Sequence, residues 1–90
     1  MESQSRPSLA PGVRLQTDKV TSEPVLLYPE GVIELNGTAH AILNLCNGAT
    51  TVAEIVTALG VEYEVEESVL RADALECLDS LLQRHLLVLK

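Results

Sequence analysis

The stretch "EGVIELNGTAHAILNLCNG", residues 30–48, changes its hydrophobic period from that of a strand to that of a helix. Before Asn36 apolar and polar residues alternate, so two faces are distinguished: Ile33 with Leu35, and Val32 with Glu34. Asn36 is a good helix N-cap, and after it apolar residues recur every three or four positions until Gly48. A strand that leads directly into a helix is therefore predicted.

Two further strands are predicted before this junction. Residues 12–18, "GVRLQTD", alternate Val13 and Leu15 with polar neighbours. Residues 24–30, "PVLLYPE", form a short apolar run between two prolines, which suits a strand of about five residues. Because short turns join the three strands, we expect an antiparallel meander.

Two further helices are predicted after the junction. Thr51 and Glu54 form a capping-box pattern that opens the first, and Gly60 is expected to end it. The longest apolar face of the chain runs from about Val65 to Arg84, and the final "HLLVLK" is expected to be a last helical turn or a short strand. The predicted fold is therefore α+β and winged-helix-like, with an N-terminal three-stranded antiparallel β-meander followed by three α-helices.

Length and composition favour one small domain. The chain has 90 residues, of which 47% are hydrophobic, but it has no Phe or Trp, so the core must be aliphatic. Residues 1–8 are polar and are expected to be a flexible tail, which leaves residues 9–90 as a single domain. The sequence shows neither a secretory signal nor an apolar run of the ~20 residues that a membrane span needs. We therefore expect a cytoplasmic protein with reduced thiols at Cys46 and Cys77.

The sequence does not support catalysis or metal binding. His40 and Cys46 share one predicted helix, but six positions place them about 120° apart around the axis and ~9 Å apart along it. They therefore do not form a nucleophile and base, and Cys46 is interpreted as a core thiol. The histidines and cysteines lack metal-site spacings, and the five glycines are isolated, so there is no phosphate loop. We expect a non-enzymatic protein without a cofactor.

The charge distribution disfavours nucleic acids and anionic membranes as partners. The net charge is −7, and residues 54–79 hold eight acids against one base, Arg71. A recognition helix for DNA would need basic residues, whereas the third predicted helix is acidic.

Asp73 and Glu76 could act as an acid/base pair, but a solvated acidic face is the better interpretation.

Residues 25–59 resemble the PqqD family of pyrroloquinoline quinone biosynthesis proteins. The similarity covers about residues 9–90, and it implies that these residues form a single peptide-recognition domain. The shared pattern is "LL.PE…ELN..A..IL.LC.G..TV..I", which this chain matches at sixteen positions from Leu26 to Ile55. The resemblance implies a peptide chaperone that binds the precursor peptide whose Glu and Tyr become the quinone. It also implies that the protein presents this peptide to a radical S-adenosylmethionine (SAM) enzyme and holds no cofactor itself.

The expected binding site is the third predicted strand together with the last helix. The resemblance implies that the peptide adds a strand beside this one, and the third strand of a meander can be an edge with unpaired backbone groups. The candidate edge residues are Val32, Ile33, Glu34 and Leu35, and the candidate helix wall is Val69, Leu70, Asp73 and Glu76.

Three alternatives stay open at the level of the sequence. Either Val32 and Glu34 or Ile33 and Leu35 point their backbone groups outward, and Val69 and Leu70 could both be plain core. The protein could also be a homodimeric winged-helix structural or regulatory protein without a peptide ligand, because an exposed edge strand favours dimerisation as well.

Overall fold

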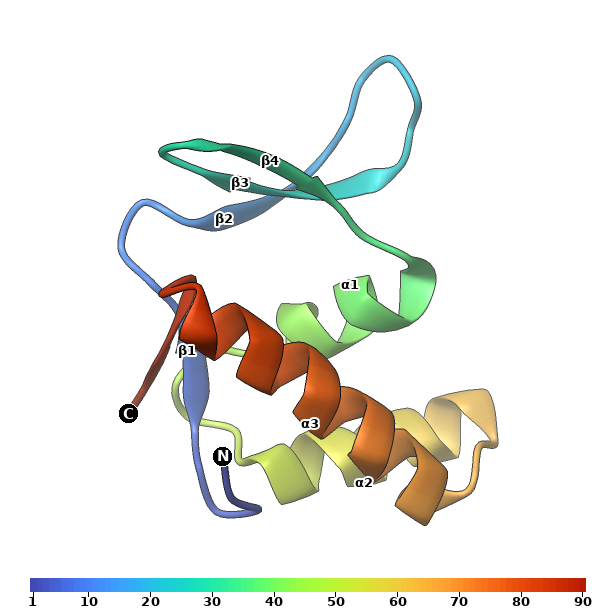
Figure 1. Cartoon of the computed structure of the whole chain (residues 1–90). Coiled ribbons are helices and arrows are strands. Elements are labelled where there is room, and N and C mark those ends of the chain that lie inside the picture. The colour runs from blue at the N-terminus through green and yellow to red at the C-terminus, as the bar shows by residue number, and fades with distance from the viewer.

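A computed structural model describes all 90 residues and confirms the predicted order of three strands followed by three helices. Two short strands lie at the chain ends: the first was not predicted, and the last is one of the two alternatives expected for the terminal segment. Figure 1 shows the first of them, β1, beside the C-terminal segment. The elements are β1 (Pro7–Leu9), β2 (Arg14–Thr17), β3 (Pro24–Tyr28), β4 (Gly31–Glu34), α1 (Gly37–Asn44), α2 (Val52–Tyr63), α3 (Glu67–Gln83) and β5 (Leu87–Leu89).

The predicted meander is a three-stranded antiparallel sheet in the order β2-β3-β4. Leu26 lies in the central strand, paired with Leu15 on one side and Ile33 on the other. Paired residues of adjacent strands point to the same face of a sheet. Since Leu26 is completely buried, this row defines the face that packs on the helices.

The helices close a single aliphatic core of 14 buried residues beneath the sheet. Two predicted caps set where helices begin. The side chain of Asn36 accepts a hydrogen bond from the backbone N–H of Ala39 at 2.7 Å. Thr51 and Glu54 form a complete capping box, each side chain accepting from the other residue's backbone N–H.

No helix has the length and apolarity needed to cross a membrane.

Helix α2 does not end at Gly60 as predicted but continues to Tyr63. A glycine inside a helix costs only about 1 kcal/mol relative to alanine, which the packing of an apolar helix face can offset. The turn to α3 passes close to this position, since a Cβ on Gly60 would lie 3.6 Å from the carbonyl oxygen of Val65. The C-cap of the helix is instead Glu64, whose φ of 53° is left-handed.

The flexible tail predicted at residues 1–8 is not what the structure shows. Strand β1 starts at Pro7, and the carbonyl oxygens of Ser3 and Ser5 accept hydrogen bonds from the first backbone N–H groups of α2. These N–H groups have no partner inside the helix, so a preceding segment can satisfy them. The N-terminal segment therefore acts as a cap for α2.

A second, two-stranded sheet joins the two ends of the chain. Strand β1 pairs antiparallel with β5, with Ser8 opposite Val88. The predicted terminal segment is therefore a strand rather than a last helical turn. It follows α3 after a sharp reversal at His85, whose φ is 63°.

Candidate functional site

Strand β4 is an edge strand, paired only with β3. In an antiparallel pair, alternate residues direct both N–H and C=O toward the partner strand, and the residues between direct theirs away. The N–H of Leu35 donates to the carbonyl oxygen of Pro24 at 3.0 Å, and Ile33 lies two residues earlier, opposite Leu26. The inward set is therefore Gly31, Ile33 and Leu35.

Val32 and Glu34 consequently direct their backbone N–H and C=O groups away from the sheet. The structure thus resolves one alternative that the sequence left open. Val32 is 57% exposed and the Glu34 side chain is also exposed, whereas Ile33 and Leu35 are half-buried against the core. Leu35 lies one residue beyond the end of β4. The edge therefore offers two N–H and two C=O groups to another strand.

A groove begins where β4 ends and follows α3. Its first part is a hollow of about 230 Å³ between α1 and α3, lined by Asn36, Thr38, Ala39, Ile42, Asp73 and Cys77. A second hollow of about 360 Å³ shares two of these residues and is lined by Asp73, Glu76, Cys77 and Ser80. We call the two together the α3 groove.

The helix-wall residues predicted from the sequence divide into two groups. Asp73 and Glu76 are exposed and line the α3 groove, as expected for a wall. Val69 is 52% exposed and lies one turn before Asp73, on the same side of the helix. Leu70 is only 4% exposed and belongs to the core cluster. Its side chain therefore lies beneath the wall and has almost no surface for a ligand.

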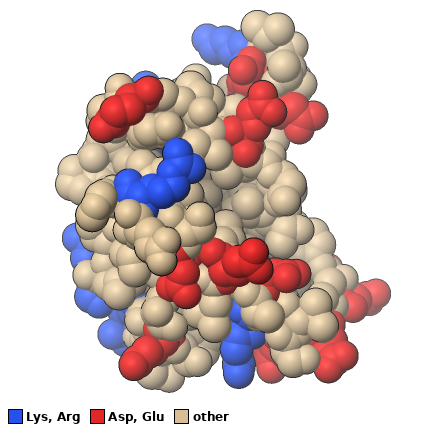
Figure 2. Space-filling model, in the orientation of Figure 1, with Lys and Arg blue, Asp and Glu red and all other residues tan.

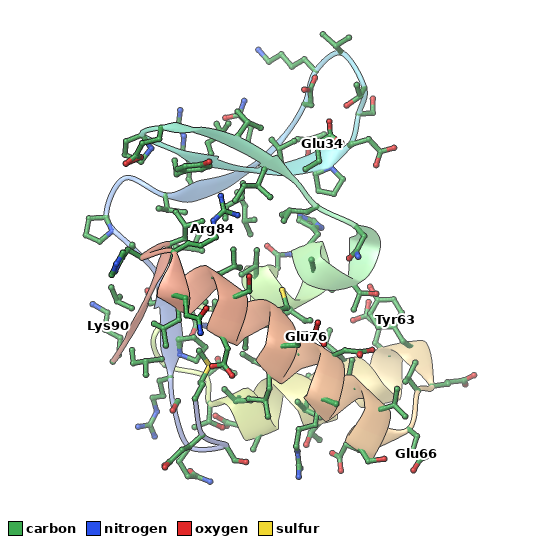
Figure 3. All side chains as sticks on the ribbon, viewed as in Figure 1. Glu34, Tyr63, Glu66, Glu76, Arg84 and Lys90 are labelled. Carbon is green, nitrogen blue, oxygen red and sulfur yellow. The ribbon has the colours of Figure 1, made fainter.

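An arginine at the other end of α3 was missed by the sequence reasoning. Arg84 Nη2 donates to the hydroxyl oxygen of Tyr28 at 3.4 Å, and its guanidinium carbon lies 5.9 Å from the ring centroid. The two residues are 56 positions apart, so no local pattern could reveal the contact. Figure 3 shows Arg84 between the end of α3 and the sheet, and Glu76 further down the helix.

The positions of Arg84 and Asp73 show that α3 runs antiparallel to β4. Tyr28 pairs with Gly31, so Arg84 marks the start of β4, whereas Asp73 and Asn36 share a hollow just past its end. The 11 residues from Asp73 to Arg84 span about 16 Å of helix. The five residues from Gly31 to Asn36 span about the same length of strand.

Acidic and basic side chains lie close together on this face. Figure 2 shows acidic side chains gathered over the middle of the visible face, with one basic side chain above them, toward the sheet, and another below them. The ammonium group of Met1 contacts Asp79 at 3.2 Å, and this is the only ion pair in the molecule. Asp73, Glu76 and Arg84 are therefore unpaired.

The thiols and histidines show no arrangement suited to catalysis. Cys46 is buried, donates to the carbonyl oxygen of Ile42 at 3.4 Å, and has its pKa raised to about 12 by burial. Cys77 is half-buried in the α3 groove, and burial raises the pKa of its thiol as well. No group of three or more His, Cys, Asp or Glu side chains is placed to hold a metal ion.

The largest hollow borders the start of β4 and includes one residue of the predicted site, Val32. It measures about 730 Å³ and surrounds the β3–β4 turn, where Tyr28, Gly31 and Val32 are among its nine lining residues. Much of it is formed by turn residues rather than by convergent polar side chains, so it does not define a small-molecule site.

The fold and the open β4 edge define the class: a small winged-helix-like α+β domain with an unpaired strand beside a helix groove. The family model described as Coenzyme PQQ synthesis protein D (PqqD) matches residues 23–87, and the chain belongs to the PqqD family. It is 39% identical over 83 residues to the PqqA binding protein of Xanthomonas axonopodis pv. citri, covering 92% of this chain and 90% of that protein.

A longer relative is the bifunctional coenzyme PQQ synthesis protein C/D of Methylorubrum extorquens. It is 40% identical over 81 residues, which are 90% of this chain but 22% of that protein. The matching region of that relative is therefore one part of a larger polypeptide.

Solved structures share the fold. The solution structure of the PqqD part of Methylobacterium extorquens PqqCD, described as a stand-alone recognition element for ribosomally synthesised, modified peptides, matches with a TM-score of 0.79 at 39% identity. The match covers 91% of this chain and 87% of that one. TbiB1 in complex with the TbiA(β) leader peptide matches with a TM-score of 0.74 at 26% identity, covering 89% and 93%.

Proposed function

We propose that this protein binds a ribosomally made precursor peptide by adding it as a strand to the β4 edge. The observation that carries the proposal is the outward orientation of the backbone groups of Val32 and Glu34, beside the α3 groove. An unpaired edge of this kind is a template for an extended peptide. The bound peptide would lie between β4 and α3.

The backbone alone would bind weakly. Two N–H and two C=O groups can form four new hydrogen bonds, each contributing about 0.5–1.5 kcal/mol. Ordering an extended peptide offsets part of this gain. Side chains docked in the α3 groove must therefore supply much of the affinity, with Val69 as an exposed apolar contact and Asp73 and Glu76 as partners for basic residues.

The relatives indicate which peptide is bound. The Xanthomonas relatives are named for binding PqqA, and the Methylobacterium structure is described as a recognition element for modified peptides. We therefore propose PqqA, the precursor peptide that supplies the Glu and Tyr of pyrroloquinoline quinone, as the ligand.

The protein's part in the pathway is proposed to be presentation rather than chemistry. We propose that it acts as a non-enzymatic peptide chaperone in the cytoplasm and delivers the bound peptide to the radical SAM enzyme that cross-links it. The unactivated thiols support this assignment, since the thiolate is the reactive form of cysteine and burial disfavours it at both positions.

A homodimer is the second candidate, and the same edge favours it. Two copies of β4 could pair with each other and satisfy the backbone groups that a peptide would otherwise bind. In that case the protein would be a structural or regulatory dimer without a peptide ligand. Peptide binding and edge-to-edge dimerisation would compete for Val32 and Glu34.

Titration of ¹⁵N-labelled protein with synthetic PqqA tests both candidates. The peptide should shift the amide signals of β4 and of α3 from Val69 to Ser80, while analytical ultracentrifugation reports the mass of the free protein. Shifts confined to α2 and β5 would refute the strand-addition proposal. A stable dimer whose β4 signals do not respond to the peptide would favour the second candidate.

A further inference from the structure

Building on the proposed strand addition, we propose that Arg84 binds a carboxylate side chain of the peptide at the position opposite Gly31. This contact would set the direction and register of the added strand. The proposal follows from where Arg84 lies, from its lack of an anionic partner, and from the position of Asp73 and Glu76 further along α3.

Three contacts place the Arg84 guanidinium at the β4 edge. Tyr28 pairs with Gly31. The Tyr28 side chain points to the face that packs on the helices, and a side chain at position 31 would point the same way. Because Gly31 has no side chain, the Tyr28 hydroxyl oxygen lies only 3.5 Å from where a Cβ would be. Arg84 Nη2 in turn lies 3.4 Å from that oxygen. A peptide residue opposite Gly31 would have its Cβ about 5 Å from the position of a Cβ on Gly31. A carboxylate on that residue would be within reach of the guanidinium.

The guanidinium is exposed and has no anionic partner. Its only hydrogen bond is to the Tyr28 hydroxyl, although it carries five donors. Arg84 is the C-cap of α3, yet its side chain crosses to the sheet instead of returning to the helix carbonyls. Glu30 and His85 line the same hollow of about 370 Å³, but Glu30 forms no ion pair with Arg84. A planar guanidinium with free donors suits a carboxylate.

The strand direction follows from the backbone of β4. In an antiparallel pairing, one peptide residue exchanges both hydrogen bonds with Val32 and another does so with Glu34, and this pairing is somewhat more stable than a parallel one. The peptide residues opposite Leu35, Ile33 and Gly31 would then follow each other at every second position from N- to C-terminus. Their side chains would face the helices.

The groove presents a different surface to each of these three positions. Asp73 and Glu76 lie toward the first, the half-buried Ile33 side chain faces the second, and Arg84 lies at the third. The peptide segment that fits is therefore basic, then apolar, then acidic, at alternate residues. A peptide in the reverse direction would place its acidic residue beside Asp73, where like charges repel.

A double-mutant cycle between protein and peptide tests the contact. Synthetic PqqA variants, each with one Asp or Glu changed to its amide, are titrated against the parent protein and against Arg84→Ala. At one peptide position the amide should weaken binding to the parent about two- to fivefold, as expected for an exposed ion pair. The same change should have no effect on Arg84→Ala. Arg71→Ala, which removes an exposed arginine elsewhere on α3, is the matched control.

Two further measurements separate this proposal from the proposed function. A nitroxide label C-terminal to the critical acidic residue should broaden the amide signal of Gly31 more than that of Glu34, and the reverse would overturn the direction. If PqqA binds at β4 but every amide variant affects the parent and Arg84→Ala equally, the carboxylate contact is refuted while strand addition stands. Loss of all β4 shifts in the parent would instead refute strand addition itself.

Discussion

The backbone N–H of Leu35 donates to the carbonyl oxygen of Pro24 at 3.0 Å, one residue beyond the end of β4. This bond shows which residues of β4 direct their backbone N–H and C=O groups toward β3 and which direct them away. Because Pro24 has no N–H of its own, it accepts from Leu35 without donating in return. Every second residue back along β4 points inward, which leaves Val32 and Glu34 for a partner.

Proline substitutions along β4 should separate binding from folding. Val32→Pro and Glu34→Pro each delete an outward N–H, so we expect folded proteins that no longer bind PqqA. Ile33→Pro and Leu35→Pro each delete a hydrogen bond to β3 and leave a carbonyl oxygen of β3 without its partner, so they should lower the free energy of unfolding by about 1–3 kcal/mol. Circular dichroism during urea unfolding and peptide titration measure the two effects.

Alanine variants are the controls for the proline series. Val32→Ala and Glu34→Ala remove the same side chains but keep the N–H groups, so they should retain most of the affinity. Wild-type affinity in folded Val32→Pro and Glu34→Pro would exclude strand addition at this edge.

The acids of the α3 groove should contribute modestly to affinity. Asp73→Asn combined with Glu76→Gln is expected to weaken binding of PqqA by about 1 kcal/mol or less, because both side chains are exposed. The effect should shrink as salt rises, since the Debye length falls to about 8 Å at physiological ionic strength. Isothermal titration calorimetry at low and high salt measures it. Unchanged affinity at low salt would remove both acids from the site.

Cys46 should be important for stability. Cys46→Ser places a hydroxyl in the aliphatic core, where transfer from water costs roughly 1–3 kcal/mol even though the hydroxyl can still donate to Ile42. Urea unfolding measures the loss. Cys77→Ser is the matched control, and because Cys77 is half-buried its cost should be smaller. Equal stability of Cys46→Ser and the parent would contradict the core assignment.

Peptide binding should protect Cys77 from alkylation. Cys77 lines the α3 groove, so bound PqqA should slow its reaction with N-ethylmaleimide at pH 8. Cys46 should remain unmodified in the folded protein, because it is buried and its pKa of about 12 leaves almost no thiolate. Mass spectrometry of proteolytic fragments locates the label. Preferential labelling of Cys46, or no protection of Cys77, would argue against this placement.

The capping box should make stability depend on pH. Hydrogen bonds from the Thr51 backbone and side chain lower the pKa of Glu54 in the folded protein. Its stabilisation is therefore present above the unfolded pKa of about 4.3 and is lost as the pH falls through the lower folded value. Glu54→Gln should lose less stability than the parent between pH 7 and pH 3, as measured by urea unfolding. Equal losses would exclude this contribution.

Local sequence patterns predicted the elements that local forces determine. The alternation before Asn36 and the helical period after it gave the β4–α1 junction, and the Thr51–Glu54 box marked the start of α2. The predicted end of α2 at Gly60 was wrong, because whether a glycine ends a helix depends on what packs around it. The α2–α3 turn passes over it instead.

Features that depend on distant contacts could not be predicted in this way. The β1–β5 pairing joins residues about 80 positions apart, and neither three-residue strand carries a periodic signal of its own. The Arg84–Tyr28 contact links the sheet to the end of α3. The separation of exposed Val69 from buried Leu70 required the rotation of α3 about its axis, which adjacent apolar residues leave open.

The β1–β5 pairing also brings the two chain ends together, with Lys90 donating its backbone N–H to the carbonyl oxygen of Arg6 at 2.9 Å. Figure 1 shows both ends on the side of the molecule away from the β2–β3–β4 sheet. A circular permutant that joins the two ends through a short linker and opens the exposed β2–β3 loop should therefore keep the β4 edge available.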